Sequence, residues 1–453
     1  MARNFISSTM CSKYEQVNGI LEAALDAVDP YLCTQRFIQI NAENLEIGKI
    51  TIPLTEIDHI YVLGTGKAVL PMTKAVCDAL GERVQGGVII GKHPHEKIMG
   101  KLPSNITVLF GGHPVPTKKS LQSAQKLADF TGQLTEKDLV FSLISGGGSA
   151  LMTLPHEGIN LADMQEVTRQ LLFSGATINE VNAVRKHLDR IKGGGLARMV
   201  WPAKLATLVL SDVIGDALDA IASGPTVADQ STYGDVLQII EKYHLETRLP
   251  KSVMRVINDG EVGKIHETVK SGEKYLENAH TFIVGSLAFA IEAARIQAVA
   301  SGFETAVLSS EVTGEAYEIG RKFGRELLKL AEGCKSGKKP ALLIAGGETT
   351  VTVKGQGKGG RNQETALSAA IEIQSCKNCL FISLATDGED GPTDAAGGAV
   401  TGATISQGAA QGLDAQDFLA RNDAYHYLQS VDGLIKIGPT GTNVNDLIFA
   451  FVF

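Results

Sequence analysis

The densest group of candidate functional residues is a glycine loop that ends a buried strand. Residues 139–144 form a nearly continuous apolar run, typical of a strand buried on both faces of a parallel sheet. The loop that follows reads Ser145-Gly146-Gly147-Gly148-Ser149. Glycines let the backbone turn its amides toward one point, which makes an anion nest, and open α/β sheets bind ligands at the carboxyl ends of their strands. The loop predicts a phosphate cradle, with a tight strand-to-helix turn as the equal alternative from these residues alone.

A lysine follows a second glycine turn, in the sequence Gly64-Thr65-Gly66-Lys67-Ala68. A Walker A loop is excluded, because Tyr61 stands where its first glycine would be and Ala68 where its Ser or Thr would be. A lysine at a strand end can still place its ammonium on a phosphate or carboxylate. We favour this role for Lys67 over that of an exposed turn lysine, because the flanking glycines leave space around it.

A third glycine loop has two interpretations. Gly355, Gly357 and Gly360 match the dinucleotide pattern G-x-G-x-x-G before a helix, with Asp387 at the end of the next strand. The preceding segment, 349–354, alternates Thr and Val and is expected to form a half-exposed hairpin strand, whereas the motif needs a buried apolar strand. We therefore favour the other interpretation, in which the loop presents Arg361 to grip a phosphate or carboxylate in two places.

Aspartates supply the acidic part of the candidate chemistry. Asp212 and Asp387 follow strand ends in glycine-rich turns, and so do Asp216, Asp390 and Asp394, for which simple turn formation is an equal alternative. One carboxylate can hold Mg²⁺ together with substrate phosphates, and a second can act as general base toward an alcohol. No Ser–His–Asp or Cys–His set accompanies them. The cradles, cations and acids together suggest a protein that handles a phosphorylated nucleotide and a small anion.

A basic helix lies between these motifs. It opens with a capping box at Thr177 and Glu180 and ends in a triple glycine. Its basic residues are Arg185, Lys186, Arg190 and Lys192. We interpret them as a solvated helix face in preference to a direct phosphate site.

The elements that must position these residues alternate between strand, glycine loop and helix, which specifies parallel α/β architecture. The expected strands are 59–63, 87–90, 106–110, 139–144, 205–210, 280–284, 305–309, 341–345, 380–385 and 447–452, and the main expected helices are 12–32, 72–80, 118–134, 287–300 and 315–330. A charged connecting segment, 231–277, marks the domain boundary. We predict two domains, 1–275 and 276–453.

Composition narrows the class of protein. The 453 residues include 49 glycines, against roughly 32 expected at ordinary usage. A net charge of −8 with interspersed signs argues against nucleic acid or an anionic membrane as the partner. No apolar run approaches the roughly 20 residues of a membrane span, and no signal pattern is evident. Six scattered cysteines indicate reduced thiols in a cytoplasmic protein, with Cys376 and Cys379 as incidental thiols at a helix end.

The sequence resembles the glycerate 2-kinase family, whose C-terminal part is the MOFRL domain and some of whose members are labelled hydroxypyruvate reductase. The matching segments span Gly64 to Gly398 in the family's order and are GTGKA, GGHPVPTKKS, SGGGSALM, NAVRKHLDRIKGGGLA, SDVIGD, SGPT, GGETTVTVKGQGKGGRNQE and TDGEDGPTDAAGG. The resemblance implies a larger N-terminal Rossmann-like domain, a smaller C-terminal MOFRL α/β domain and an active site in the cleft between them. It implies ATP-dependent phosphorylation of D-glycerate to 2-phosphoglycerate, and NAD(P)H-dependent reduction of hydroxypyruvate is the alternative.

The resemblance also implies roles for individual residues. The family's catalytic lysine, aspartate and arginine fall on Lys67, Asp212 and Arg361. We expect Lys67 and Arg361 to neutralise the γ-phosphate and the glycerate carboxylate, and Asp212 to orient or deprotonate the attacking hydroxyl. Asp387 is the candidate for Mg²⁺. The residues expected to hold ATP are Ser145, Gly146, Gly147, Gly148, Ser149, Gly359 and Gly360.

One departure from the family pattern is visible. The family usually has Gly-Ser-Asn where this chain has Gly285-Ser286-Leu287, so any contact made by that amide is lost here. The role of His113 and the oligomeric state stay open, and a homodimer is one arrangement that the sequence allows.

Overall fold

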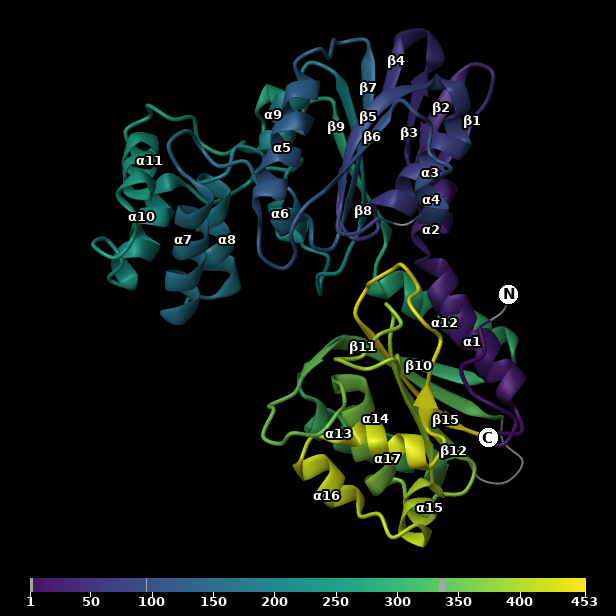
Figure 1. The fold of residues 1–453 in the computed structure, drawn as a ribbon. Coiled ribbons are helices and arrows are strands. Elements are labelled where there is room, and N and C mark those ends of the chain that lie inside the picture. The colour runs from purple at the N-terminus through teal and green to yellow at the C-terminus, as the bar shows by residue number, and fades with distance from the viewer. Residues whose placement is uncertain (1–2, 95, 334–338) are drawn as a thin grey trace. The chain divides into compact units, whose positions relative to one another are not determined.

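The computed structural model describes residues 3–94, 96–333 and 339–453 of the chain. These form two compact units (Figure 1). The first, called here the C-terminal unit, combines Met1–Asp29 with Gly285–Phe453, and the second, the N-terminal unit, is Pro30–Val284.

The N-terminal unit is built on a six-stranded sheet with the order β6-β5-β4-β7-β8-β9, in which the pairs from β6 through β8 are parallel. The strands are β4 (His59–Thr65), β5 (Val84–Gly91), β6 (Ile106–Phe110), β7 (Asp138–Ser145), β8 (Lys204–Leu210) and β9 (Ala279–Gly285). If β4 is counted as strand 1, the order is 3-2-1-4-5-6, which is the Rossmann order. The direction in which successive strands are added reverses between β4 and β7. Every residue of β7 is buried, as its apolar run predicts. The predicted Rossmann-like parallel sheet is confirmed.

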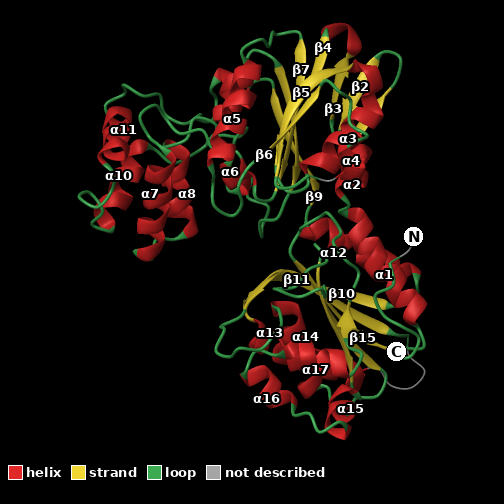
Figure 2. Cartoon of the chain, viewed as in Figure 1, coloured by secondary structure: helices red, strands yellow, loops and turns green. Residues whose placement is uncertain are grey.

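Helices and a small antiparallel sheet surround this sheet (Figure 2). The helices are α2 (Pro30–Arg36), α3 (Val69–Leu80), α4 (Glu96–Met99), α5 (Lys118–Thr131), α6 (Gly148–Leu151) and α9 (Gly195–Val200). The small sheet consists of β1 (Ile38–Ile40), β2 (Asn44–Ile47) and β3 (Ile50–Pro53), which the sequence analysis did not predict. Leu127 of α5 and Leu196 of α9 belong to one apolar core with Leu63 and Val140 of the large sheet. This core fixes the strands whose ends carry the candidate site.

Four further helices of the N-terminal unit have a core of their own. They are α7 (Leu161–Phe173), α8 (Ile178–His187), α10 (Tyr233–Lys242) and α11 (Lys251–Glu261). Val184, Tyr233 and Val256 are among the residues that fill this core. The capping box predicted for α8 is confirmed, because the Glu180 carboxylate accepts from the backbone N–H of Thr177 at 2.8 Å and Thr177 Oγ1 accepts from Glu180 N–H at 3.4 Å.

The C-terminal unit contains a mixed six-stranded sheet with the order β10-β11-β15-β12-β13-β14. Only the β10–β11 pair is parallel among these described strands. The strands are β10 (Glu304–Glu315), β11 (Ala341–Thr350), β12 (Cys379–Ala385), β13 (Gly397–Thr401), β14 (Leu434–Ile435) and β15 (Asp446–Val452). The helices are α1 (Tyr14–Ala27), α12 (Leu287–Ala300), α13 (Ala316–Gly333), α14 (Arg361–Glu372), α15 (Thr404–Ala410), α16 (Ala415–Ala420) and α17 (Ala424–Ser430).

The division of the chain differs from the predicted boundary between 275 and 276. Helix α1 belongs to the C-terminal unit, where it packs against α12 and buries Val17, Ile20 and Leu21. The amphipathic spacing of α1 predicts a buried face but contains no information about which distant element covers it. For that reason the predicted N-terminal domain, 1–275, includes this helix.

The prediction of a separate hairpin strand at 349–354 is wrong. Strand β11 runs without a break to Thr350 and pairs with β10 as far as Glu315. Gly346 and Gly347 lie inside the strand, and a Cβ on Gly347 would sit 2.0 Å from the carbonyl oxygen of Val312. The glycines therefore permit close approach of two backbones and do not end the strand.

The expectation for Cys376 and Cys379 is also corrected, because the two form a disulfide. Cys376 lies in the turn after α14 and Cys379 is the first residue of β12, and their Cα atoms are 5.9 Å apart, within the range that a disulfide spans. Cys11, Cys33 and Cys77 are buried and form no disulfide among the described residues, as expected for reduced thiols. Cys334 lies outside the described residues.

Among the described helices, none combines the length and the apolar character that crossing a bilayer requires.

Candidate active site

The site of the N-terminal unit lies at the reversal of strand order. Lys67 follows β4 and the glycine loop follows β7, and these neighbouring parallel strands end at the same edge of the sheet. The two loops bond to each other: Lys67 N–H donates to the Gly146 carbonyl at 2.9 Å, and Ala68 N–H donates to Ser145 Oγ at 3.0 Å. The fold thus joins two motifs that the sequence separates by almost eighty residues.

Asp212 and Lys67 flank the glycine loop. A Cβ built on Gly146 would lie 2.1 Å from Asp212 Oδ2, and one built on Gly147 would lie 3.5 Å from Lys67 Cε. Gly147 also has a φ of +82°, a conformation that side-chain-bearing residues rarely adopt. Glycine at these positions therefore brings a carboxylate and an ammonium group against the backbone of the loop. The sequence-predicted residues Lys67, Asp212 and 145–149 form one cluster.

His113 is a further member of this cluster. A Cβ on Gly147 would meet its imidazole, with 2.8 Å to Cδ2 and 3.1 Å to Nε2. Burial, and after it the positive charge of Lys67, lowers the pKa of His113 to about 4. The imidazole is therefore neutral at physiological pH and can accept or donate one hydrogen bond without adding charge. In the sequence His113 belongs to the GGHPVPT segment. No spacing between that segment and the glycine loop indicates that the two lie together.

The predicted solvated face of the basic helix is wrong for three of its four residues. Lys186 and Lys192 are buried, and the Arg185 side chain is largely covered. Arg185 Nη2 donates to Ser149 Oγ at 3.0 Å, and Ser149 Oγ lies 2.8 Å from Ser223 Oγ. A signal was present in the sequence: Val181, Val184, Arg185 and Leu188 stand at i, i+3, i+4 and i+7, which places the arginine on the apolar stripe of α8.

Arg361 lies in the C-terminal unit as the first residue of α14. Its Nε and Nη2 donate to the two carboxylate oxygens of Asp446 at 2.6 and 3.1 Å, and Nη1 donates to Glu348 Oε1 at 2.8 Å. Burial raises the pKa of Asp446 to about 6, although the bond to Arg361 favours its charged form. Burial disfavours the charge of Arg361, but the bond to Asp446 keeps its pKa above the ordinary value. The guanidinium thus already grips a carboxylate with two parallel bonds.

The glycine loop before Arg361 uses its amides inside the C-terminal unit. Asn422 Oδ1 accepts from the N–H groups of Lys354 and Gly355, and Asp423 Oδ1 accepts from Lys358 N–H. Cβ atoms on Gly355 and Gly357 would collide with the 421–423 segment at 2.2 to 2.7 Å. These glycines therefore serve close packing of two chain segments, and the loop lacks the open backbone that a pyrophosphate needs.

The remaining aspartates have different surroundings. Asp390 is buried and caps α14, because its carboxylate accepts from the N–H groups of Asn362 at 3.1 Å and Gln363 at 2.9 Å. Asp394 is exposed and bonds to Tyr425 Oη and Lys436 Nζ. Asp216 adopts a φ of +54° in its turn. Helix capping thus accounts for Asp390, turn formation for Asp216 and an ion pair with Lys436 for Asp394.

Asp387 follows β12 and is half-buried, with Oδ1 accepting from Glu389 N–H at 3.1 Å. A carboxylate is the ligand type that Mg²⁺ prefers, and this ion is commonly held by one or two carboxylates together with substrate phosphates. Groups of three or more His, Cys, Asp or Glu side chains able to hold a metal are absent from the described residues. The donor type of Asp387 fits Mg²⁺.

Leu287, where the family pattern has Asn, is the first residue of α12 and is buried. A Cβ on Gly346 of β11 would come within 2.7 Å of Leu287 Cδ1. In this chain the position is part of the apolar contact between α12 and β11.

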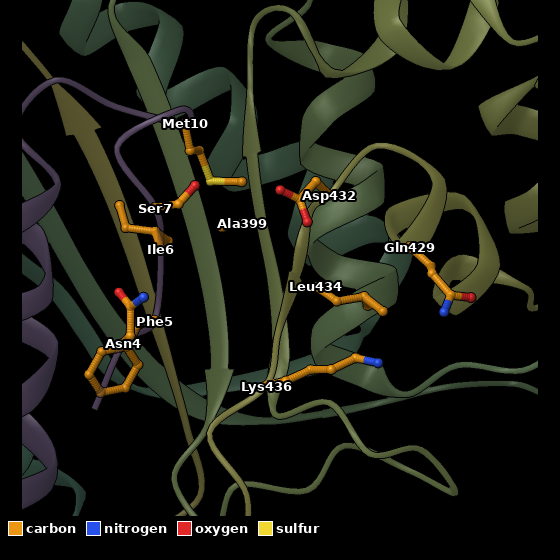
Figure 3. Close-up of a pocket in the computed structure, with 10 residues that line it drawn as sticks. All are labelled: Asn4, Phe5, Ile6, Ser7, Met10, Ala399, Gln429, Asp432, Leu434 and Lys436. Atoms are coloured by element: carbon orange, nitrogen blue, oxygen red, sulfur yellow. The ribbon is translucent and has the colours of Figure 1, made fainter. Parts of the chain in front are cut away.

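The C-terminal unit also contains a cavity of about 370 Å³ that involves none of the predicted site residues (Figure 3). The N-terminal segment 4–10 forms one side, and Ala399 of β13, Gln429 of α17 and Leu434 of β14 lie on the other. Lys436 Nζ, at its rim, bonds to Asp394 and Tyr425. Its lining includes one lysine, Lys436, and one aspartate, Asp432, but none of the residues of the glycine loop 145–149.

Two family models match the chain. A domain of unknown function, DUF4147, matches residues 16–258, and the MOFRL family matches residues 341–446. The chain is 42% identical to the D-glycerate 2-kinase of Thermotoga maritima over 404 residues, which are 89% of this chain and 93% of the relative. It is 41% identical to the glycerate 2-kinase of Pyrococcus horikoshii over 95% of each chain. The crystal structure of the T. maritima glycerate kinase matches with a TM-score of 0.87 at 38% identity, over 98% of this chain and 100% of that chain.

Proposed function

The chain belongs to the glycerate 2-kinase family, and we propose that it transfers the γ-phosphoryl group of ATP to the 2-hydroxyl of D-glycerate. The products are ADP, 2-phosphoglycerate and a proton. The relative from T. maritima, 42% identical over 93% of its length, is named D-glycerate 2-kinase.

One observation of geometry carries the proposal. Lys67, the glycine loop and Asp212 follow three adjacent strands, β4, β7 and β8, and their loops meet at the reversal of strand order. Phosphoryl transfer needs positioning and charge neutralisation more than covalent chemistry, and a backbone nest with one cation and one carboxylate provides both. Because Asp212 lies against Gly146, an alcohol bound at the loop would be within reach of a proton acceptor.

In the proposed reaction each residue has one role. The glycine loop 145–149 holds phosphate oxygens, and Lys67 neutralises charge on the transferred phosphoryl group. Asp212 orients the 2-hydroxyl and accepts its proton as the oxygen bonds to phosphorus and the bond to the leaving ADP oxygen breaks. Arg361 binds an anionic group of the reactants. For this, at least one of its present bonds to Asp446 or Glu348 must break. An active site shared by both units, with Gly359 and Gly360 contributing to the nucleotide site, remains a prediction.

ATP is the phosphoryl donor that a kinase of this family implies. We propose Mg²⁺ as its companion ion, with Asp387 as the protein ligand; when bound, the ion neutralises the nucleotide phosphates. An Asp387→Asn variant tests this assignment. It should raise the Mg²⁺ concentration needed for half-maximal rate, whereas Asp394→Asn, at an exposed and already bonded carboxylate, should not.

The decisive experiment is incubation of the purified protein with ATP, Mg²⁺ and D-glycerate, with ADP release and the phosphorus NMR spectrum followed together. A 2-phosphoglycerate signal matched to the ADP released is the expected result, and a 3-phosphoglycerate signal would contradict the proposed regiochemistry. Parallel incubation with hydroxypyruvate and NADH tests the reductase alternative. NADH consumption without ADP release in the first assay would overturn the kinase assignment.

Two further expectations are part of this proposal. We place the enzyme in the cytoplasm, which fractionation of the source cells would test. A homodimer is one assembly that the sequence allows, and light scattering on the purified protein gives the mass that tests it.

A further inference from the structure

Arg185 is a covered guanidinium for which the described residues supply no matching anion. It lies on the apolar stripe of α8, and its one hydrogen bond in the structure runs from Nη2 to Ser149 Oγ at 3.0 Å. Burial lowers the pKa of this guanidinium, while the charge of Asp189 acts in the opposite direction from beyond ion-pair distance. An arginine has five N–H donors, so most of the donors of Arg185 have no acceptor among the described residues.

Two neighbours of Arg185 show what the same fold does with cations that serve structure. Lys192 Nζ lies 2.5 Å from Asp189 Oδ2 and donates to the carbonyl oxygen of Met152 at 3.1 Å. Lys186 Nζ lies 3.2 Å from a carboxylate oxygen of both Asp219 and Asp229. Each buried lysine has its carboxylate, and Arg185 has none within ion-pair distance in the described part of the chain.

A covered cation without a counter-ion destabilises a protein unless a ligand supplies the charge. Arg185 contacts the last residue of the glycine loop, beside Ser223 of the loop that follows β8. Ser149 directly follows Gly146, Gly147 and Gly148, so the guanidinium of Arg185 lies at the end of the glycine loop. An oxyanion placed there would meet the fork of Arg185, the Ser149 hydroxyl and the loop amides together.

We propose that Arg185 is a substrate-binding residue that grips an oxyanion of the reactants at the glycine loop. The inference rests on the proposed kinase function for the identity of that oxyanion, which is either a phosphate of ATP or the carboxylate of glycerate. A carboxylate is planar and a phosphate is tetrahedral, and a guanidinium can hold two oxygens of either group with two parallel hydrogen bonds. The residue thereby completes an anion site whose other cation is Lys67.

The test compares Arg185→Met and Arg185→Lys with the wild type, and uses Lys192→Met as the example of a structural cation. The thermal midpoint is measured without ligand, and isothermal titration then gives the Kd of ATP–Mg²⁺ and of D-glycerate, each alone. We expect Arg185→Met to keep or raise the midpoint without ligand and to weaken one of the two ligands at least tenfold, with the other changed less than twofold. Arg185→Lys should recover only part of the affinity, because an ammonium lacks the fork.

The identity of the weakened ligand assigns the oxyanion to the nucleotide or to the acid. Unchanged Kd values for both ligands would overturn the proposal, and so would a fall of the midpoint without ligand comparable to that of Lys192→Met, which would make Arg185 structural. Titration of inorganic phosphate separates this proposal from the kinase assignment. If the wild type phosphorylates no glycerate but binds phosphate at least tenfold more tightly than Arg185→Met does, the anion site stands and the proposed function fails.

Discussion

The carboxylate of Asp212 lies directly against the backbone of Gly146: a Cβ on that glycine would come within 2.1 Å of Asp212 Oδ2. The identity of one residue as glycine thus decides where the proposed proton acceptor sits relative to the phosphate cradle. This relationship could not be read from the sequence, in which the two residues end different strands.

Gly146→Ala should separate the cradle from the carboxylate. Either Asp212 or the loop must move, and a misplacement of about 1 Å in a catalytic arrangement lowers rates by about a hundredfold. We expect kcat to fall by that order while the thermal midpoint changes little. Gly132→Ala is the matched control, because Gly132 has a helical φ of −64° and the nearest atom to its Cβ would be 3.5 Å away. Equal losses of activity in both variants would contradict the assigned role of Gly146.

Lys67→Met should remove the charge that acts on the transferred phosphoryl group. Loss of one such group in a preorganised site lowers the rate by about 10² to 10³-fold. Steady-state kinetics with ATP and D-glycerate measure the effect. Lys126→Met, at an exposed position of α5, serves as control and should keep full activity. A Lys67→Met enzyme with wild-type turnover would exclude the residue from catalysis.

Asp446 predicts a pH dependence of stability. Burial raises its pKa from an ordinary 3.8 to about 6, so the folded protein binds this proton more tightly than the unfolded chain does. The contribution of Asp446 to the free energy of unfolding is therefore fully present below about pH 4 and is lost as the pH rises through about 6. The thermal midpoint of the wild type minus that of Asp446→Asn should decrease between pH 4 and pH 6 and level off above. A difference that stays flat or rises over this range would contradict the raised pKa of Asp446.

Lys192→Met should destabilise the N-terminal unit strongly. Removing one partner of a buried ion pair leaves the other charge uncompensated and costs about 3–5 kcal/mol. Asp189 is that partner, and it also accepts from the backbone N–H groups of Leu154 and Ile191, so it cannot turn to solvent. Urea unfolding gives the free energy of unfolding. A loss below about 1 kcal/mol would mean that Asp189 becomes protonated or hydrated in the variant.

The strands and their glycine-rich ends could be predicted from the sequence because both signals are local. The apolar run of β7 is buried at every position, and the turn after it is the loop that meets Lys67. Strand boundaries agreed to within a few residues for β4, β6 and β8, where a continuous apolar run stops at glycine or a polar residue.

The rest depended on contacts between distant parts of the chain. The basic residues of the segment 185–192 were taken as solvated, because a list of charges does not show that Asp189 and Asp229 would meet Lys192 and Lys186 in the interior. Gly346 and Gly347 were interpreted as a strand end, although they are the point where β11 passes close to Val312. His113 had no local signal at all, since only the folded chain brings its ring to Gly147.

The packing of α1 on α12 has a consequence for how the chain is made. A ribosome releases α1 long before it releases α12, so the apolar stripe of this first helix waits while all of Pro30–Val284 emerges and can fold as a unit. Helix α12 then packs on a helix that was made much earlier. A nascent chain halted before α12 would therefore present Val17, Ile20 and Leu21 to the cell's chaperones, and that exposure would end only after α12 has emerged from the ribosome.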